Sequence, residues 1–236
     1  DEPLREGTMP AHCPEHTDGA SYPSHFHLEG LMAAYYVTGN PDFKNVATKV
    51  GEKLLRWQKE NQAIFYADAR ECGWPMLAFL CMHRHTGEQK WLDACEEIFQ
   101  FYRERTNDEG EIQFDLPHRL GLVTRPYGNF MAWRGCFFYY ERTQKEEVRL
   151  FLLEVLDKIY KYSPEQVGVG GWASNDLFPA WAGYTLSGED RFIEDNYLFL
   201  RALMNKEGNF PWAGVDMHYY LAELDERGTL EGLQEG

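Results

Sequence analysis

The sequence predicts an all-α protein whose helical hairpins form an α/α toroid, and three observations support this prediction. A short Thr-Gly or Ser-Gly phrase recurs along the chain. Segments that are apolar on all sides alternate with segments whose apolar residues recur every three or four positions, as in amphipathic helices. Long connections rich in Gly, aromatic and polar residues separate the pairs of segments, and such connections are usually functional in a compact domain.

The repeated phrase defines the hairpins. Its anchors are Thr38, Thr86, Thr143 and Ser187, the third in a degenerate copy, and they lie 48, 57 and 44 residues apart. Periods of this size are typical of stacked supersecondary units. A glycine after the anchor suits the left-handed residue that ends a helix. The aromatic residue that follows shortly after, such as Trp91, is expected to pack back over the turn.

Each hairpin is expected to join an inner helix to an outer one. The inner helices are apolar on all sides and contain small residues that permit close packing. They are expected over Phe26–Val37, Trp74–His83, Phe130–Tyr140 and Leu177–Leu186. The outer, amphipathic helices are expected over Phe43–Trp57, Trp91–Tyr102 and Phe151–Tyr162. Solenoids of TPR or HEAT type have shorter or more regular units and a less aromatic inner face, which favours the toroid.

The long connections all precede inner helices, so we expect them to gather on one face of the toroid. They are Glu60–Cys72, Asn107–Tyr127, Ser163–Asp176 and Lys206–His218. A ring of six hairpins would need about 300 residues, whereas this chain supplies four hairpins and the start of a fifth at His218–Leu224. We therefore expect residues 1–236 to form one toroid domain, an incomplete ring of about four to five hairpins, by itself or as a piece of a longer protein.

Composition argues against several classes of function. The 236 residues include 23 Lys and Arg against 38 Asp and Glu, which gives a net charge of −15 with His neutral. This charge disfavours nucleic acids and anionic membranes as partners, and no apolar run approaches the ~18 residues of a membrane helix. The five cysteines include no C-x-x-C pair, so Cys81, Cys95 and Cys136 are expected to be buried thiols. No signal peptide is visible, and localisation is left unassigned.

Polar residues are densest before the first inner helix, where His25, His27 and Glu29 end a His-rich segment. The N–H groups at a helix start favour anions, and His25 and Glu29 share a helix face at i, i+4. We expect these residues to serve catalysis or sugar binding. The alternative is that Ser24 caps the helix while the histidines pack. No metal site is expected, since H-x-H fits a strand better than a helix.

Each later connection places an aromatic residue beside a polar or charged one. Trp and Tyr can stack on pyranose rings, while Arg, Asn, Asp and His can bind hydroxyl and carboxylate groups. The expected substrate-binding residues are Arg70, Trp74, Arg125, Tyr127, Asn129, Trp172, Asn175, Asp176 and Trp212. For Trp74 and Trp133, core packing is an equal alternative, and Arg70 with Glu71 could be a surface pair. The Gly168–Gly171 run lacks the Lys-Ser/Thr of a P-loop, which excludes nucleotide binding.

Arg134 lies inside an apolar inner helix, where an unpaired charge is costly. It either pairs inside the protein or faces a wet central funnel, and we expect the second. His218 and Tyr219 lie at the start of the last apolar segment. The expected catalytic residues are His25, His27, Glu29, Arg134, His218 and Tyr219.

The run from His25 to Gly39 resembles the H-x-E-G-L…Y-Y…T-G pattern that opens an inner helix in α/α-toroid carbohydrate-active enzymes. The family that it resembles most is the toroid domain of exo-acting rhamnogalacturonan lyase-like proteins, and the β-L-arabinofuranosidase-type hydrolases are second. The resemblance implies a secreted or periplasmic enzyme that acts on an oligo- or polysaccharide. The lyase family also carries β-rich domains, which this sequence lacks.

Three functions are considered, and we expect the first. The first is a polysaccharide lyase that performs β-elimination on uronate-containing, pectin-like or rhamnogalacturonan-like glycans, with Arg binding the carboxylate and His or Tyr as base and acid. The second is a glycoside hydrolase with two carboxyl groups; the candidates are Glu29, Glu71, Asp176 and Asp216. The third is a non-catalytic carbohydrate-binding module or helical-repeat scaffold. No cofactor is expected for any of them.

Overall fold

The structure is a computed structural model that describes residues 28–66, 69–113, 127–159, 178–195, 222 and 225–227. For Ile64, Arg70 and residues 127–130 it describes the backbone alone. These described residues are mostly helical and contain no strand, apart from one isolated bridge between Thr106 and Ile112. The helices are α2 (Leu28–Thr38), α3 (Pro41–Glu60), α4 (Gln62–Phe65), α5 (Ala69–Thr86), α6 (Lys90–Arg105), α7 (Tyr127–Thr143), α8 (Glu146–Ile159) and α9 (Phe178–Ser187). The all-α prediction is confirmed for this part of the chain.

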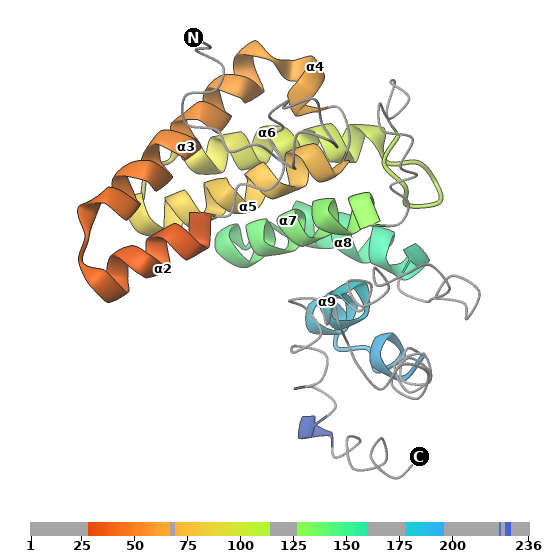
Figure 1. Cartoon of the computed structure of the whole chain (residues 1–236). Coiled ribbons are helices and arrows are strands. Elements are labelled where there is room, and N and C mark those ends of the chain that lie inside the picture. Colours follow the sequence, from red (N-terminus) through yellow and green to blue (C-terminus); the bar gives the residue numbers. More distant parts are fainter. Residues whose placement is uncertain are drawn as a thin grey trace, which may run out of the picture.

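Successive helices pair as hairpins (Figure 1). Helix α2 packs on α3, α5 on α6 and α7 on α8, and α5 also packs closely along α7. Each outer helix contacts the inner helix of the next hairpin as well: α3 contacts α5, α6 contacts α7 and α8 contacts α9. The described helices therefore form an inner layer of α2, α5, α7 and α9 and an outer layer of α3, α6 and α8.

The repeated phrase forms the same turn in the four described hairpins. In each copy the hydroxyl group of the Thr or Ser anchor donates to the carbonyl four residues earlier. The next residue has a positive φ of 54° to 72°, and its N–H donates to a carbonyl at 2.7 to 2.9 Å. In the degenerate copy Gln144 adopts this conformation in place of glycine. The repeat in the sequence is therefore a repeat in the structure.

An aromatic residue packs over two of these turns, as predicted. The indole N–H of Trp91 donates to Thr86 Oγ1 at 2.9 Å. At the last turn Phe192 is buried so closely against Gly183 that a Cβ on this glycine would lie 2.2 Å from its ring. In these two hairpins the aromatic residue thus fixes the second segment to the end of the first helix.

The inner helices α2, α5 and α7 run parallel. Tyr36 Oη lies 2.8 Å from His85 Nδ1, near the C-terminal ends of α2 and α5. Arg142 Nε donates to His83 Nδ1 at 2.9 Å, near the C-terminal ends of α5 and α7. All three helices begin on the right of Figure 1 and end on the left. Their N-terminal ends therefore lie at one end of the array.

Glycines allow α5 and α7 to approach each other closely. A Cβ on Gly73 would lie 2.8 Å from the backbone carbonyl of Met131, and a Cβ on Gly135 would lie 2.9 Å from Met76 Sδ. Protein interiors are close-packed, so a larger side chain at either glycine would push the two helices apart. The small residues of the inner helices thus set the spacing of this layer.

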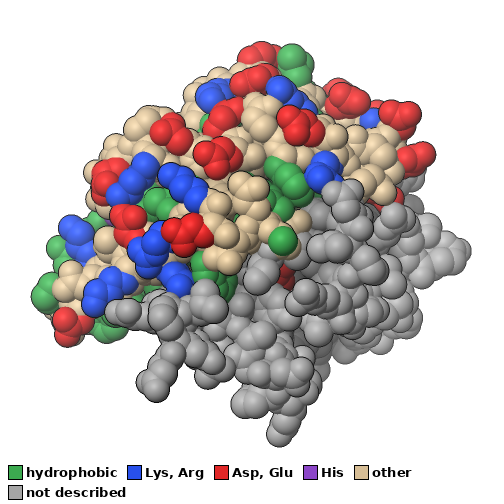
Figure 2. Space-filling view, turned by 90° about the horizontal axis from the view of Figure 1, so that it is seen from above, with side chains coloured by type: hydrophobic (Ala, Val, Ile, Leu, Met, Phe, Trp, Pro, Cys, Tyr) green, Lys and Arg blue, Asp and Glu red, His purple; other side chains and the backbone are tan. Residues whose placement is uncertain are grey.

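The core lies between the two layers. Trp91 stacks on Phe79 with ring centroids 6.0 Å apart, and Trp133 lies edge-on to Tyr102 at 6.3 Å. All four rings are fully buried. Four cysteines are free and buried, as expected for three of them; they are Cys72, Cys81, Cys95 and Cys136. On the surface seen from above, acidic and basic side chains are interleaved (Figure 2).

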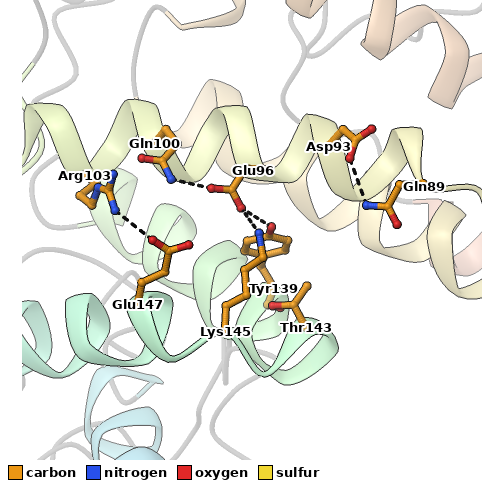
Figure 3. A network of polar contacts seen from close by, with 9 residues as sticks. All are labelled: Gln89, Asp93, Glu96, Gln100, Arg103, Tyr139, Thr143, Lys145 and Glu147. Carbon is orange, nitrogen blue, oxygen red and sulfur yellow. Dashed lines mark hydrogen bonds and ion pairs between the residues drawn. The ribbon is translucent and has the colours of Figure 1, made fainter.

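Polar contacts tie α6 to the α7–α8 hairpin (Figure 3). The Glu96 carboxylate on α6 accepts from Tyr139 Oη at 2.6 Å, from Lys145 Nζ at 2.5 Å and from Gln100 Nε2 at 2.5 Å. Burial by itself would raise the pKa of Glu96, but the hydrogen bonds lower it. Burial and the bond to this carboxylate raise the pKa of Tyr139.

The prediction of a connection over Glu60–Cys72 is partly wrong. Helix α4 occupies part of it, and α5 begins at Ala69 instead of Trp74. Pro75 therefore lies inside α5 and not in its first turn, where proline is most easily accepted. A hydrogen bond from Tyr102 Oη to the Ala69 carbonyl, 2.9 Å long, anchors the early start. Residues 69–72, which were expected in a connection, thus belong to a helix.

Candidate functional site

The first turn of α5 holds a buried carboxylate. The Glu71 side chain is only 3% exposed, so it is a core position and not the surface position that one alternative assumed. The unpaired backbone N–H groups in the first turn of a helix favour a carboxylate there. Next to it, Gly73 brings this end of α5 against the backbone of α7. The start of α5 is therefore a rigid, tightly packed position.

The inner layer leaves one side of its helices partly open, and we call this side the inner face. On α5 the residues of the inner face lie roughly opposite the residues that pack on α6. On α7 the two residues of the inner face lie one helical turn apart. The same side of the layer continues with one tryptophan of α9. The half-buried residues of the inner face are Trp74, Leu77, Arg134, Phe138 and Trp181.

Arg134 is the cation of the inner face. Its side chain is half-buried, and its guanidinium carbon lies 5.8 Å from the centre of the Phe138 ring. Stacking on an aromatic ring orients a guanidinium group. A planar fork of this kind binds carboxylates in a bidentate way. The position is therefore suited to an anionic ligand that also presents an apolar ring face.

The structure separates two tryptophans that the sequence could not distinguish. Trp133 is completely buried, and its ring centroid lies 5.7 Å from that of Phe151, so it belongs to the core. Trp74 is half-buried on the inner face. Of the two, Trp74 is the one that can contact a ligand.

Glu29 lies in the first turn of α2 and is exposed. Burial, with a smaller effect of the Glu29 charge, raises the pKa of Cys81 to about 12. The same carboxylate partly opposes the effect of burial on His85, whose pKa is lowered. Glu29 is therefore within electrostatic reach of α5 and lies at the end of the array where the inner helices begin.

The remaining predicted site residues are placed as follows. Arg70 lies in the first turn of α5, and Tyr127 and Asn129 lie in the first turn of α7, described by their backbone only. The others lie outside the described residues; they are His25, His27, Arg125, Trp172, Asn175, Asp176, Trp212, His218 and Tyr219. The described part of the site thus joins Trp74 and Arg134 on the inner face, with Glu29 at the start of α2.

Two inner-face residues, Leu77 and Phe138, were not predicted as candidates. Their spacing carried a signal: residue 77 lies three positions after Trp74, and residue 138 lies four positions after Arg134, so each shares a helix face with its partner. Trp181 of α9 was not predicted as a candidate either.

The described residues contain no group of three or more His, Cys, Asp and Glu side chains placed to hold a metal ion. Nor does any of their helices combine the length and apolar character that crossing a membrane requires. Comparisons with protein-family models, with curated proteins and with solved structures found no match to the chain.

Proposed function

We propose that this chain is the toroid domain of a carbohydrate-active enzyme that cleaves uronate-containing glycans by β-elimination. The observation that carries the proposal is the inner face, where half-buried Arg134 lies over the Phe138 ring and Trp74 is also half-buried. A uronate presents a carboxylate and an apolar sugar face, and this combination of side chains matches both. The proposal includes a curved inner layer whose parallel helices surround the substrate from one side.

Elimination makes three chemical demands. The substrate carboxylate must be neutralised so that the proton on C5 becomes acidic, and Arg134 is proposed to do this through paired hydrogen bonds. A base then removes the C5 proton, the electron pair forms the C4–C5 double bond, and the C4–O bond breaks. The leaving oxygen takes a proton from an acid. We propose His25, His27, His218 and Tyr219 as the pool of bases and acids.

Positive charge at the site itself would allow a chain of net charge −15 to bind an anionic substrate. Charge at a site matters more for a bound anion than the total, because solvent screens interactions beyond about 8 Å at physiological ionic strength. Arg134, with Arg70 and Arg125 as further proposed ligands, would supply the local positive charge. Partners expected of this site are oligo- or polysaccharides, without a cofactor.

Elimination is favoured over hydrolysis by the positions of the two described carboxylates that hydrolysis could use. A hydrolase needs both groups open to one substrate-sized space, about 5–9.5 Å apart. Glu71 is 3% exposed and packed at the start of α5, whereas Glu29 is exposed on α2. A buried and an exposed carboxylate on different helices give little support to a paired mechanism.

The test incubates the whole chain with pectic and other uronate oligosaccharides and follows the absorbance of unsaturated uronates. We expect a rise with at least one substrate, its loss in Arg134→Ala, and partial recovery in Arg134→Lys, which restores charge without the planar fork. Arg103→Ala is the matched control, because Arg103 is an exposed arginine on the outer helix α6.

The control must retain the activity of the unmodified chain. New reducing ends without an absorbance rise would replace elimination by hydrolysis. Binding of oligosaccharides without either product would reduce the proposal to a binding module, and the absence of binding would reject the inner face as a saccharide site.

A further inference from the structure

A groove separates the outer helices α3 and α6, away from the inner face. Its volume is about 370 Å³, within the range of small-molecule pockets. At one end Lys90 Nζ donates to Glu52 at 2.6 Å, and farther along Gln58 Nε2 donates to the Ala94 carbonyl at 3.0 Å. These two contacts show that α3 and α6 run parallel along the groove, with the ion pair closing one end.

Beyond this ion pair the two walls carry opposite charges. Helix α3 contributes Arg56 and Lys59, and α6 contributes Asp93 and Glu97. Within the described residues, neither cation forms an ion pair, although both line the same groove as the two carboxylates. Glu60, the last residue of α3, adds a carboxylate at the open end. The groove therefore has cations of α3 on one wall and carboxylates of α6 on the other, without ion pairs between them.

The ion pair at the closed end shows that pairing across these helices is possible where side chains meet. The hydrogen bonds from Lys90 to Glu52 and to Glu88 raise the pKa of Lys90. Here the signs are reversed, with the carboxylate on α3 and the cation on α6. Farther along the groove no ion pair joins the described cations of α3 to the carboxylates of α6, so a ligand could bridge these charges.

Gln58 supplies a buried polar atom to the groove. Its side chain is 1% exposed, and its Nε2 donates to Ala94 and to Tyr66 Oη, both at 3.0 Å. This arrangement assigns the amide nitrogen, because the carbonyl of Ala94 can only accept. Gln58 therefore joins α3 to α6 within the lining of the groove.

We propose that the groove between α3 and α6 binds a small zwitterion that carries a primary ammonium group and a carboxylate, such as an ω-amino acid. The carboxylate lies against Arg56 and Lys59. The ammonium group lies against Asp93 and Glu97. This binding site is separate from the proposed glycan site and does not depend on it.

The experiment titrates the ¹⁵N-labelled whole chain with glycine, β-alanine, 4-aminobutyrate and 6-aminohexanoate and records amide chemical shifts. Probes of different chain length are compared because the ammonium and carboxylate groups must reach opposite walls of the groove. We expect saturable shifts confined to α3 and α6, with a dissociation constant in the millimolar range. The N-trimethyl analogue of the best probe should bind at least about tenfold more weakly, since it has no N–H to donate.

Matched variants test which charges hold the ligand. Arg56→Gln and Glu97→Gln should each weaken binding by about tenfold, the value of one lost charge-assisted hydrogen bond. Glu104→Gln, an exposed carboxylate on α6 outside the groove, should bind like the unmodified chain. Failure of every probe to saturate would overturn the proposal. So would equal binding of the trimethyl analogue, or equal affinity of the groove variants and the Glu104→Gln control.

Discussion

Arg142 on α7 donates its Nε–H to Nδ1 of His83 on α5, at 2.9 Å. This bond requires a neutral imidazole, because a protonated Nδ1 cannot accept. Burial and then the Arg142 charge lower the pKa of His83. The contact therefore joins two inner helices only while His83 is uncharged.

Acidification should weaken this end of the array. His83 and His85 both have pKa values lowered from 6.5 in the folded chain, so the unfolded chain binds more protons. Their contribution to stability is complete above pH 6.5 and is lost as the pH falls from there through the folded pKa values. Urea unfolding at several pH values between 7.5 and 5 should show a falling midpoint. His83→Asn, which keeps an acceptor but does not titrate, should reduce the slope, and an unchanged slope would contradict the assignment.

The close approach of α5 and α7 can be tested with a pair of glycines. Gly73→Ala places a Cβ at 2.8 Å from the Met131 carbonyl and should lower the free energy of unfolding by about 1–3 kcal/mol. Gly30→Ala, in α2 with no atom within 4 Å of the new Cβ, should raise it by up to about 1 kcal/mol because alanine favours helix. Denaturant unfolding measures both, and equal effects would refute the close contact.

The degenerate turn offers a route to a more stable chain. Gln144 has a φ of 54°, where a side chain is strained and glycine is not. Gln144→Gly should raise the free energy of unfolding by about 0.5–1 kcal/mol, reduced by loss of the Gln144 Nε2 bond to the Glu141 carbonyl. Gly87→Ala, at φ 71° in the second turn, should lower it by about 1 kcal/mol. Thermal unfolding of the two variants should shift in opposite directions.

The Glu96 contacts predict a measurable cost when the acceptor is removed. Glu96→Ala leaves the Tyr139 hydroxyl without its partner in a half-buried site and should lower stability by about 1–3 kcal/mol. Tyr139→Phe removes only the donor and should cost about 1 kcal/mol. A double-mutant cycle should give a positive coupling between the two positions, and additive losses would argue against the bond.

The buried cysteines should resist aqueous thiol reagents. Cys72, Cys81, Cys95 and Cys136 are buried and free, and burial raises the pKa values of Cys81, Cys95 and Cys136. Since the chain has five cysteines, at most one equivalent should react in the native state and five in denaturant. Fast reaction of two or more native thiols would be inconsistent with this core.

The sequence was sufficient to predict the hairpins because their turns depend on local chemistry. In the described turns a Thr or Ser hydroxyl and a following residue with positive φ give the same local geometry, and the amphipathic outer helices reveal their buried side through periodicity. The early start of α5 was missed because it depends on Tyr102, a residue of the next helix. Tertiary contacts of this kind override a local signal such as Pro75.

The site was harder to predict from sequence because the inner helices are apolar on all sides. Such a helix has no polar face to tell which side remains open, so Trp74 and Trp133 looked equivalent. Only the packing of α7 on α6 and α8 makes Trp133 core and leaves Trp74 and Arg134 half-buried. The outer groove was missed for a similar reason, since its charges look like an ordinary solvated surface.

The turns lie at one end of the array and the connections at the other, and the two ends differ in how much their length can vary. Every described turn between an inner and an outer helix has the same hydrogen bonds and nearly the same length, so one end is fixed in geometry. The segments between a described outer helix and the next inner one differ more in length: they span residues 61–68, 106–126 and 160–177. Insertions and deletions should therefore be tolerated at the end where the inner helices begin. This difference between the two ends would let the ligand specificity of the proposed site change while the helices stay in place.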